Sequence, residues 1–203
     1  MLSFIRDNWR FTRDNARWIG GGFLLTLFSS FGQTFFIGLS GNDIRATFGL
    51  SGGAFGGLYM LATLGSALTL PWLGRTLDLM PGWKVARFSL PMLAVACVAI
   101  ALAPGVVMLC IALYLLRLFG QGMMTEIAFT EVGRWFVASR GRAMALVTPG
   151  IMLGNGVLPL AFVLIHRSLG WQGAWLVSAA LIVLIGWPAI IALIRVERVP
   201  HSS

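Results

Sequence analysis

A charged residue stands in the middle of the apolar stretch Leu113-Tyr-Leu-Leu-Arg117-Leu-Phe-Gly-Gln121-Gly-Met-Met-Thr125-Glu126. The whole apolar run extends from about Val106 to Ala128, close to the ~20 residues that a helix needs to cross a bilayer. A charge at the centre of such a helix costs at least roughly 2.5–3.5 kcal/mol on insertion scales. We therefore expect Arg117 to face a protein interior or a water-filled cavity rather than lipid.

Polar residues follow Arg117 at helical spacing. Gln121 and Thr125 come four and eight residues later, which places them with Arg117 on one helix face that can bind a polar solute. Glu126 comes nine residues later, a rotation of about 900° in an α-helix. We therefore expect Glu126 to point to the opposite face.

The composition is that of an integral membrane protein. Of the 203 residues, 58% are hydrophobic and only 11% are charged, which is too apolar for a soluble domain of this length. The net charge of +8 does not indicate a nucleic-acid partner, because the basic residues lie between apolar runs rather than in one patch. Cys97 and Cys110 fall within apolar runs and predict two buried side chains rather than a disulfide or a metal site.

Six apolar runs predict six transmembrane helices and hence an all-α integral membrane fold. The runs cover residues 18–39, 52–73, 85–103, 106–128, 143–165 and 174–194. Each is close to the ~20 residues that a spanning helix needs. The chain then divides into a cytoplasmic N-terminal segment (1–17), a six-helix bundle (18–194) and a cytoplasmic tail or the start of a linker (195–203).

The distribution of basic residues sets the expected orientation. Twelve of the fifteen Lys and Arg residues flank one side of the predicted bundle, two flank the other, and Arg117 lies within the membrane. Because positive charge favours the cytoplasmic side, we expect both termini in the cytoplasm, with the chain in the inner or plasma membrane of the cell. Two interpretations stay open for the stripe before the first run: a helix on an anionic leaflet, or an ordinary positive flank. Its members are Arg6, Arg10, Arg13 and Arg17.

Closely spaced glycines mark the second and fifth runs. The second begins Gly52-Gly-Ala-Phe-Gly56-Gly57, and the fifth contains Gly150 and Gly154. Such spacing lets helix backbones approach closely. The second and fifth runs are the middle helices of the first and second groups of three, so their shared glycines fit two inverted three-helix repeats.

Several motifs resemble those of the major facilitator superfamily. Gly74-Arg75-Thr-Leu-Asp78, followed by Gly82 and Lys84, is similar to the family's signature loop between the second and third helices, although Pro81 stands where the second glycine is expected. Arg117 to Gly122 resembles the fourth-helix signature, with Gln121 one residue later than the commonest spacing. Further resemblances lie at Arg134-Trp-Phe136, Arg140-Gly-Arg-Ala143, Thr148-Pro-Gly150, Gly154-Asn-Gly156, Pro159 and Gly170-Trp-Gln172.

The resemblance implies a fold of twelve helices in two six-helix halves, with a substrate site near the midplane between the halves. This chain supplies six of those helices. The first and fourth would line the cavity, and the second and fifth would pack against the other half, which the glycine placement fits. That half could be fused, separate or a second copy of the chain.

The resemblance makes Arg117 the first candidate for a substrate or coupling site. In the family, the matching arginine is linked to substrate anions or to proton coupling. A guanidinium keeps its proton, so Arg117 could bind an anion or shift the pKa of a neighbouring carboxyl, and its alternative is a structural role with carbonyl partners. The other candidates, each with helix packing as its alternative, are Gln121, Thr125, Gln33, Thr34 and Asn155.

The signature loop implies a cytoplasmic latch that holds the outward-open state. We expect a carboxylate of Asp78, Glu126 or Glu131 to pair with a nearby cation. The alternative is a set of solvated charges that contribute little individually. The candidate members are Gly74, Arg75, Asp78, Gly82, Lys84, Arg87, Glu126, Glu131 and Arg134.

These patterns together predict a secondary active transporter of a small organic solute that works by alternating access, with Arg117 favouring an anion. The expected partners are the lipid bilayer, the solute, protons and a second six-helix half. The alternative is a six-helix membrane protein without transport activity, either a regulatory partner or a truncated remnant. We see no catalytic or metal-ligand spacing and expect no enzyme, metal or cofactor. The sequence leaves the solute, the coupling ion and the oligomeric state open.

Overall fold

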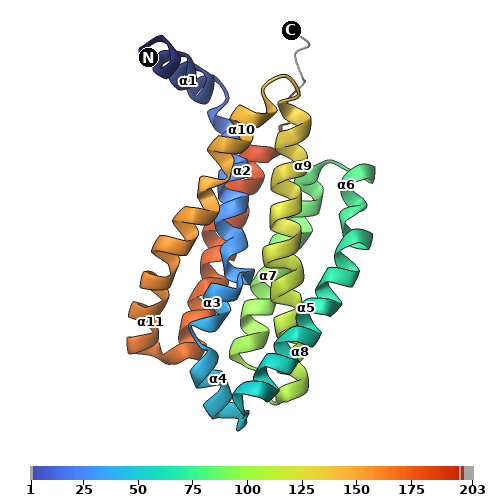
Figure 1. Ribbon diagram of the computed structural model, residues 1–203, viewed down its shortest axis with the longest axis vertical. Coiled ribbons are helices and arrows are strands. Elements are labelled where there is room, and N and C mark those ends of the chain that lie inside the picture. The colour runs from blue at the N-terminus through green and yellow to red at the C-terminus, as the bar shows by residue number, and fades with distance from the viewer. Residues whose placement is uncertain (1, 197, 199–203) are drawn as a thin grey trace.

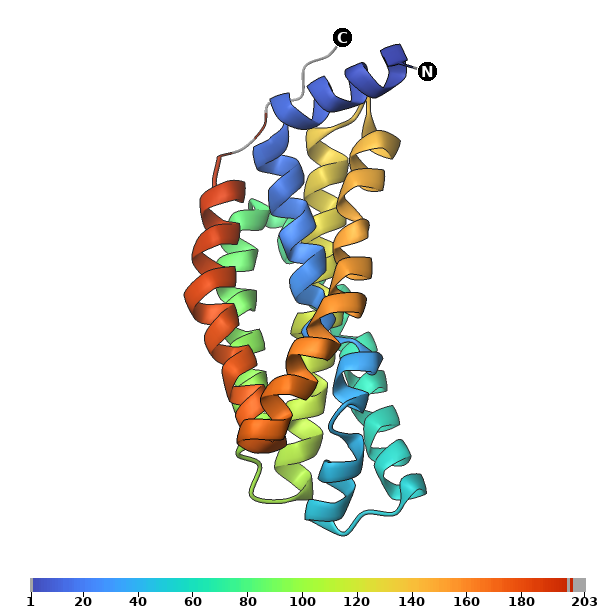
Figure 2. The same ribbon diagram turned by 90° about the vertical axis from the view of Figure 1, so that its left-hand side faces the viewer.

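The computed structural model describes residues 2–196 and residue 198 of the chain. This described part consists of helices and contains no strand (Figures 1 and 2). The segments η1, η2 and η3 are short departures from α-helical geometry, the first 3₁₀-helical and the others π-helical. The elements in chain order are α1 (Leu2–Asp14), α2 (Ala16–Phe28), η1 (Ser29–Gly32), α3 (Thr34–Gly38), α4 (Gly41–Phe48), α5 (Gly52–Gly74), α6 (Thr76–Leu79), α7 (Gly82–Ala101), α8 (Val106–Leu115), η2 (Leu116–Met124), α9 (Thr125–Trp135), α10 (Arg140–Val147), α11 (Pro149–Leu181), η3 (Ile182–Gly186) and α12 (Trp187–Ile194).

Five helical segments among the described residues are long and apolar enough to cross a membrane. The last of them has 55 residues, far more than the ~20 that a bilayer needs. Gly170 interrupts it with φ 73° and ψ 174°, and the chain reverses direction at the lower end of α11 (Figure 1). Only glycine adopts such a positive φ without strain. The five segments are Ala16–Gly38, Gly52–Leu79, Gly82–Ala101, Val106–Trp135 and Arg140–Ile194.

The helices are arranged around α2. It packs against α9, α11 and α12. In the view of Figure 2, α5 and the long first part of α11 lie on one side of the bundle, with α7 and α12 on the other. At the end away from α1, the rings of Phe36, Phe162 and Trp175 pack edge to face, with centroids 5.0 to 5.7 Å apart. The buried Trp175 Nε1 donates to Ser40 Oγ at 3.0 Å. This aromatic cluster joins α3 to both parts of α11.

Helices α5 and α11 carry wide apolar surfaces that no described residue covers. Within Gly52–Leu79 only 11% of the most apolar stretch is buried. A membrane helix with such a face must contact lipid or another membrane helix. The most exposed apolar residues of the two helices are Met60, Leu61, Leu64, Leu68 and Trp72 on α5, and Met152, Leu160 and Leu164 on α11.

The glycine pair of α11 packs inward, which corrects the interpretation that it faces a second half. A Cβ atom on Gly150 would clash with Thr26 Oγ1, and one on Gly154 would clash with Ser30 Oγ. Both contacts are with the first membrane segment, so this pair of glycines brings α11 close to α2 and η1. By contrast, Gly56 of α5 has no neighbour within 4 Å of where its Cβ would be.

The first and last helices are joined at one end of the bundle. Arg17 donates from Nε to the Leu193 carbonyl at 2.9 Å and from Nη2 to the Ala192 carbonyl at 2.6 Å. These bonds satisfy carbonyl groups at the C-terminus of α12 that lack helical partners. Trp18 Nε1 donates to the Val196 carbonyl at 2.8 Å, and α1 lies across the same end (Figure 2). Of the predicted tail 195–203, residues 197 and 199–203 lie outside the described part.

Candidate functional site

The first membrane segment is broken where it meets η2. Helix α2 gives way to η1, and Gln33 is extended, with φ −77° and ψ 150°, before α3 begins. A Cβ atom on Gly32 would clash with backbone atoms of Leu116, Gly120 and Gln121. The two backbones therefore touch only because Gly32 and Gly120 have no side chains. This contact brings the Gly32 carbonyl within reach of Arg117.

Arg117 reaches across this contact to the first segment. Its Nη1 donates to the Gly32 carbonyl at 3.2 Å and to Thr34 Oγ1 at 3.4 Å. Thr34 Oγ1 in turn lies 2.8 Å from the Tyr59 hydroxyl, and the guanidinium lies over the Tyr59 ring, 5.5 Å from its centroid. All these partners are neutral, and within the described ranges no carboxylate forms an ion pair with Arg117. Arg117 therefore forms no ion pair with the described residues.

A cavity of about 200 Å³ lies beside Arg117, between α5 and η2. The predicted residues Arg117, Gln121 and Thr125 all line it. Each contributes a buried polar atom without a hydrogen-bond partner among the described residues: Arg117 Nε, Gln121 Oε1 and Thr125 Oγ1. Buried polar groups without partners cost free energy, so a cavity with three of them favours a polar ligand.

Glu126 lines the same cavity, which corrects the prediction that it points to the opposite face. The reason is η2, which is π-helical from Leu116 to Met124. A π-helix bonds residue i to residue i+5, so each turn holds about one residue more than in an α-helix and each residue rotates the chain less. The smaller total rotation brings Glu126 to the side of Arg117. Departures of this kind are frequent at functional sites.

The other predicted site residues lie at different distances from this cluster. Thr34 belongs to it through its contacts with Arg117 and Tyr59. Gln33 is half-buried at the break, and Asn155 is exposed on α11. Within the described residues, no hydrogen bond joins Gln33 or Asn155 to Arg117.

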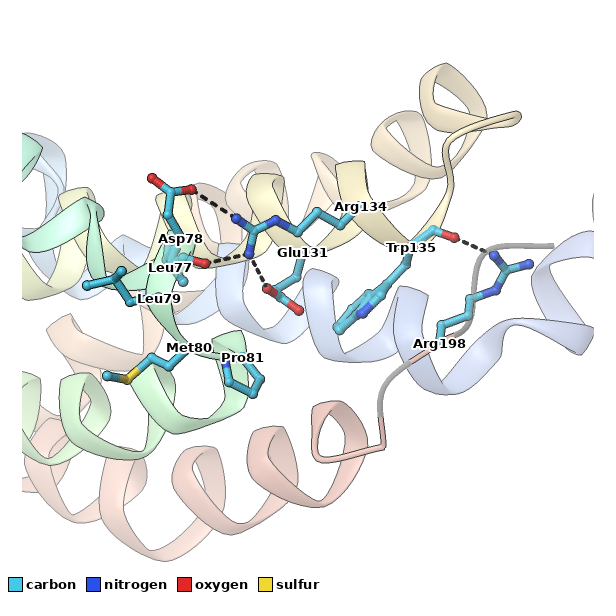
Figure 3. Close-up of a pocket in the computed structure, with 9 residues that line it drawn as sticks. All are labelled: Leu77, Asp78, Leu79, Met80, Pro81, Glu131, Arg134, Trp135 and Arg198. Atoms are coloured by element: carbon cyan, nitrogen blue, oxygen red, sulfur yellow. Dashed lines mark hydrogen bonds and ion pairs between the residues drawn. The ribbon is translucent and has the colours of Figure 1, made fainter. Parts of the chain in front are cut away.

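A second cluster lies at the end of the bundle that carries α1 (Figure 3). Arg134 Nη2 lies 3.0 Å from Asp78 Oδ1, while its Nη1 donates to the Leu77 carbonyl at 2.5 Å and lies 3.4 Å from Glu131 Oε1. Glu131 is buried and also accepts the Gly82 backbone N–H at 3.3 Å. Arg134 therefore connects α9 to α6 and, through Glu131, to the start of α7.

The Gly82 position requires a glycine, because a Cβ atom there would clash with the Glu131 side chain. The cluster borders a pocket of about 380 Å³, where Arg198 donates to the Trp135 carbonyl (Figure 3). The side chains of Arg134 and Asp78 are 43% and 74% exposed, so their ion pair contributes only about 0–1 kcal/mol to stability.

Among the described residues, the other charged members of the predicted latch form no ion pair with this cluster, and Glu126 lines the Arg117 cavity instead. Arg75 lies over the Trp72 ring at 5.2 Å, and Lys84 lies over the Trp83 ring at 5.6 Å. Gly74 has no neighbour within 4 Å of where its Cβ would be. Arg87 is exposed on α7.

Sequence reasoning missed the contribution of α5 to the Arg117 cavity. Thr63 and Ser66 line the cavity, and Tyr59 completes the contact with Thr34. These three residues follow one another at intervals of four and three, which is the spacing of one helix face. That polar stripe on an otherwise apolar helix was a usable signal.

The described residues offer no group of three or more His, Cys, Asp or Glu side chains that could hold a metal ion. His166 Nε2 lies 3.3 Å from Asp43 Oδ2, a single pair between α11 and α4.

Comparison with known proteins identifies the family of the chain. No curated protein matches the chain. Residues 22–203 match the family model described as Major Facilitator Superfamily, a range that includes both clusters. The chain therefore belongs to the Major Facilitator Superfamily, whose members are multi-pass membrane transporters of small molecules and are generally not enzymes.

Proposed function

We propose that the chain is one six-helix half of a secondary transporter that carries a small organic anion by alternating access. The observation that carries this proposal is Arg117, a cation in the middle of a membrane helix whose described partners are all neutral. An unneutralised charge in the membrane is costly, and such residues mark substrate or ion pathways.

The chemistry of a guanidinium favours an anion over a neutral solute. It carries five N–H donors, keeps its charge and binds a carboxylate or phosphate through two parallel hydrogen bonds. In Arg117 only Nη1 donates to described residues, and Nε is buried without a partner. The amide of Gln121 and the hydroxyl of Thr125 add neutral groups that can orient the anion.

The cavity itself supports a shared site between two halves. Its volume of about 200 Å³ is smaller than the ~300–1,000 Å³ of typical ligand sites. The apolar faces of α5, which lines the cavity, and of α11 are exposed. A second six-helix half packed on those faces would enlarge the cavity and close it from lipid.

We interpret the segment Arg140–Ile194 as two spans divided at Gly170. Each part is then long enough for one crossing, and the total becomes six. An even number of spans leaves α1 and the end of α12 on one side, and the bond between Arg17 and α12 supports this arrangement. The excess of Arg on that side favours the cytoplasm, with residues 1–17 as a cytoplasmic segment, 18–194 as the bundle and 195–203 as a tail or linker.

The proposal is tested by measuring which small solutes stabilise the purified protein against heat. The panel consists of acetate, lactate, succinate, benzoate and methyl phosphate, each beside a neutral amide or alcohol of similar size. We expect at least one anion to bind, and Arg117→Gln to weaken its binding at least about tenfold, because an ionic hydrogen bond is worth roughly 1.5–3 kcal/mol. Arg117→Lys should retain part of the affinity, since the charge remains and the planar fork is lost.

The matched control is Arg167→Gln, which removes an exposed arginine outside the cavity. An anion whose affinity is the same in Arg117→Gln and the original protein would contradict the proposed site. The bound anion is then followed by uptake into cells that express the chain. Binding without uptake would favour the alternative, a partner subunit without transport activity.

A further inference from the structure

A groove of about 680 Å³ opens on the side of the bundle away from α5, between α7 and α12. It is distinct from the Arg117 cavity and from the Asp78 cluster, with which it shares no lining residue. Its lining combines an apolar wall, two tryptophans and two arginines. The lining residues are Trp83, Arg87, Val183, Trp187, Pro188, Ile191, Ala192 and Arg195.

The two arginines of the groove have no partner of their own. Across residues 2–196 and 198, the side chains of Arg87 and Arg195 make no hydrogen bond, ion pair or ring contact. Nearby arginines differ: Arg17 donates to carbonyl groups of α12, and Arg134 pairs with Asp78. No acidic residue lines the groove, so its two charges are uncompensated.

The position of the groove places it at the level of lipid headgroups. Trp83 lies at the start of α7 and Arg195 directly after the end of α12, and tryptophan and arginine both favour the membrane–water interface. Trp187, the first residue of α12, lies about two turns deeper. Farther along, Phe88, Leu184 and Ile185 are more than half exposed on the same two helical segments. In a membrane protein these side chains contact acyl chains. The groove therefore joins the acyl region to the interface.

We propose that this groove binds an anionic phospholipid, with its phosphate between Arg87 and Arg195 and one acyl chain along the apolar wall of α12. Basic pockets between membrane helices near the interface bind anionic headgroups. The N-terminus of α7, which begins at Gly82, adds a favourable dipole for negative charge. Free inorganic phosphate would contact only the two arginines, whereas a phospholipid would also contact the apolar wall. This inference depends only on the location of the protein in a membrane and not on which solute it transports.

The test is native mass spectrometry of the full chain in detergent, titrated separately with dioleoylphosphatidylglycerol and dioleoylphosphatidylcholine. We expect the anionic lipid to bind more tightly. The double variant Arg87→Gln/Arg195→Gln should weaken its binding roughly 25-fold, about fivefold for each arginine. Arg140→Gln, which removes an exposed arginine at the same end of the bundle but outside the groove, should leave it unchanged.

A second variant separates the phospholipid from free phosphate. Ala192→Trp occupies the space beside the exposed apolar wall and keeps both arginines, so it should also weaken the binding of phosphatidylglycerol. Millimolar inorganic phosphate should not displace the lipid. The proposal is overturned if the two lipids bind equally, if Arg140→Gln acts like the double variant, or if phosphate displaces the lipid while Ala192→Trp has no effect.

Discussion

Two arginines of this chain illustrate how the partners of a charge set its role. Arg117 contacts a carbonyl, a hydroxyl and an aromatic ring, so its charge stays available to a ligand. Arg134 contacts two carboxylates and a carbonyl, so its charge is used within the protein. The first arrangement suits binding, and the second suits a connection between helices that can be made and broken.

Asp78→Asn tests whether the outer part of that connection controls a conformational equilibrium. We expect the uptake rate to fall by about fivefold, because an exposed ion pair worth about 1 kcal/mol biases two states by that factor. Membrane insertion should be unchanged, since Arg134 keeps its bonds to Leu77 and Glu131. The measurements are initial uptake rate and the amount of protein in the membrane.

Asp14→Asn is the matched control for this change. It removes an exposed carboxylate at the same end of the bundle, on α1, outside the Asp78 cluster. Equal uptake in Asp78→Asn and the original protein would rule out a latch at this position.

Among the elements, η2 has the largest effect on the site. Its π-helical turns bring Arg117, Gln121, Thr125 and Glu126 to one cavity, although the last of these would face away in an α-helix. The opposing element is the break at η1, whose Gly32 lies against Gly120. The site therefore depends on two irregular elements that fit each other.

Gly32→Ala tests how tightly these elements fit. A methyl group at this position meets backbone atoms, which cannot move aside as a flexible side chain could. We expect a loss of about 1–3 kcal/mol in stability, as for overpacked cores, and a fall of roughly 2–4 °C in the unfolding midpoint for each kcal/mol. Circular dichroism during heating in detergent measures it.

Gly38→Ala provides the comparison for Gly32→Ala, because Gly38 also ends a short helix of the first segment and its Cβ would meet nothing within 4 Å. Equal unfolding midpoints for the two variants would show that η1 and η2 can separate without cost.

The sequence predicted most of these elements because hydropathy and charge act residue by residue. The apolar runs overlap the observed segments, and the predicted latch includes Asp78, Glu131 and Arg134, which the structure brings together. The predicted helix face of Glu126 was wrong because the π-helical hydrogen-bond pattern of η2 cannot be read from hydropathy. The predicted packing partner of Gly150 was wrong because a glycine pair indicates a close helix contact but does not identify the other helix.

At the scale of the whole molecule, the exposed faces of α5 and α11 predict an assembly with a second half. We expect a nitroxide on Leu64→Cys in the native membrane to be shielded from dissolved oxygen, because α5 would pack against that half. A nitroxide on Leu184→Cys of η3 should be accessible, since it faces lipid. Both residues are more than half exposed in the chain alone, at 53% and 73%. Both variants are made in a background without Cys97 and Cys110.

Equal oxygen accessibility at the two labels would mean that α5 also faces lipid, contrary to the proposed half-transporter. The intact mass of the polypeptide from the same membrane then shows how the second half is supplied. A mass near 22.0 kDa means that it is a separate chain, and about twice that mass means that it is fused.

The bond from Arg17 to the carbonyl groups of Ala192 and Leu193 has a consequence for how the protein is made. A ribosome completes the first membrane segment long before it reaches residue 192, and contacts so distant in sequence form late. Until then Arg17 and Trp18 have no partners at the membrane edge, and the hollow that α12 fills beside α2 stays open. Helix α2 is therefore in the membrane before its partner α12 has been synthesised. A chaperone or insertase that shields α2 during that interval would govern the yield of folded protein.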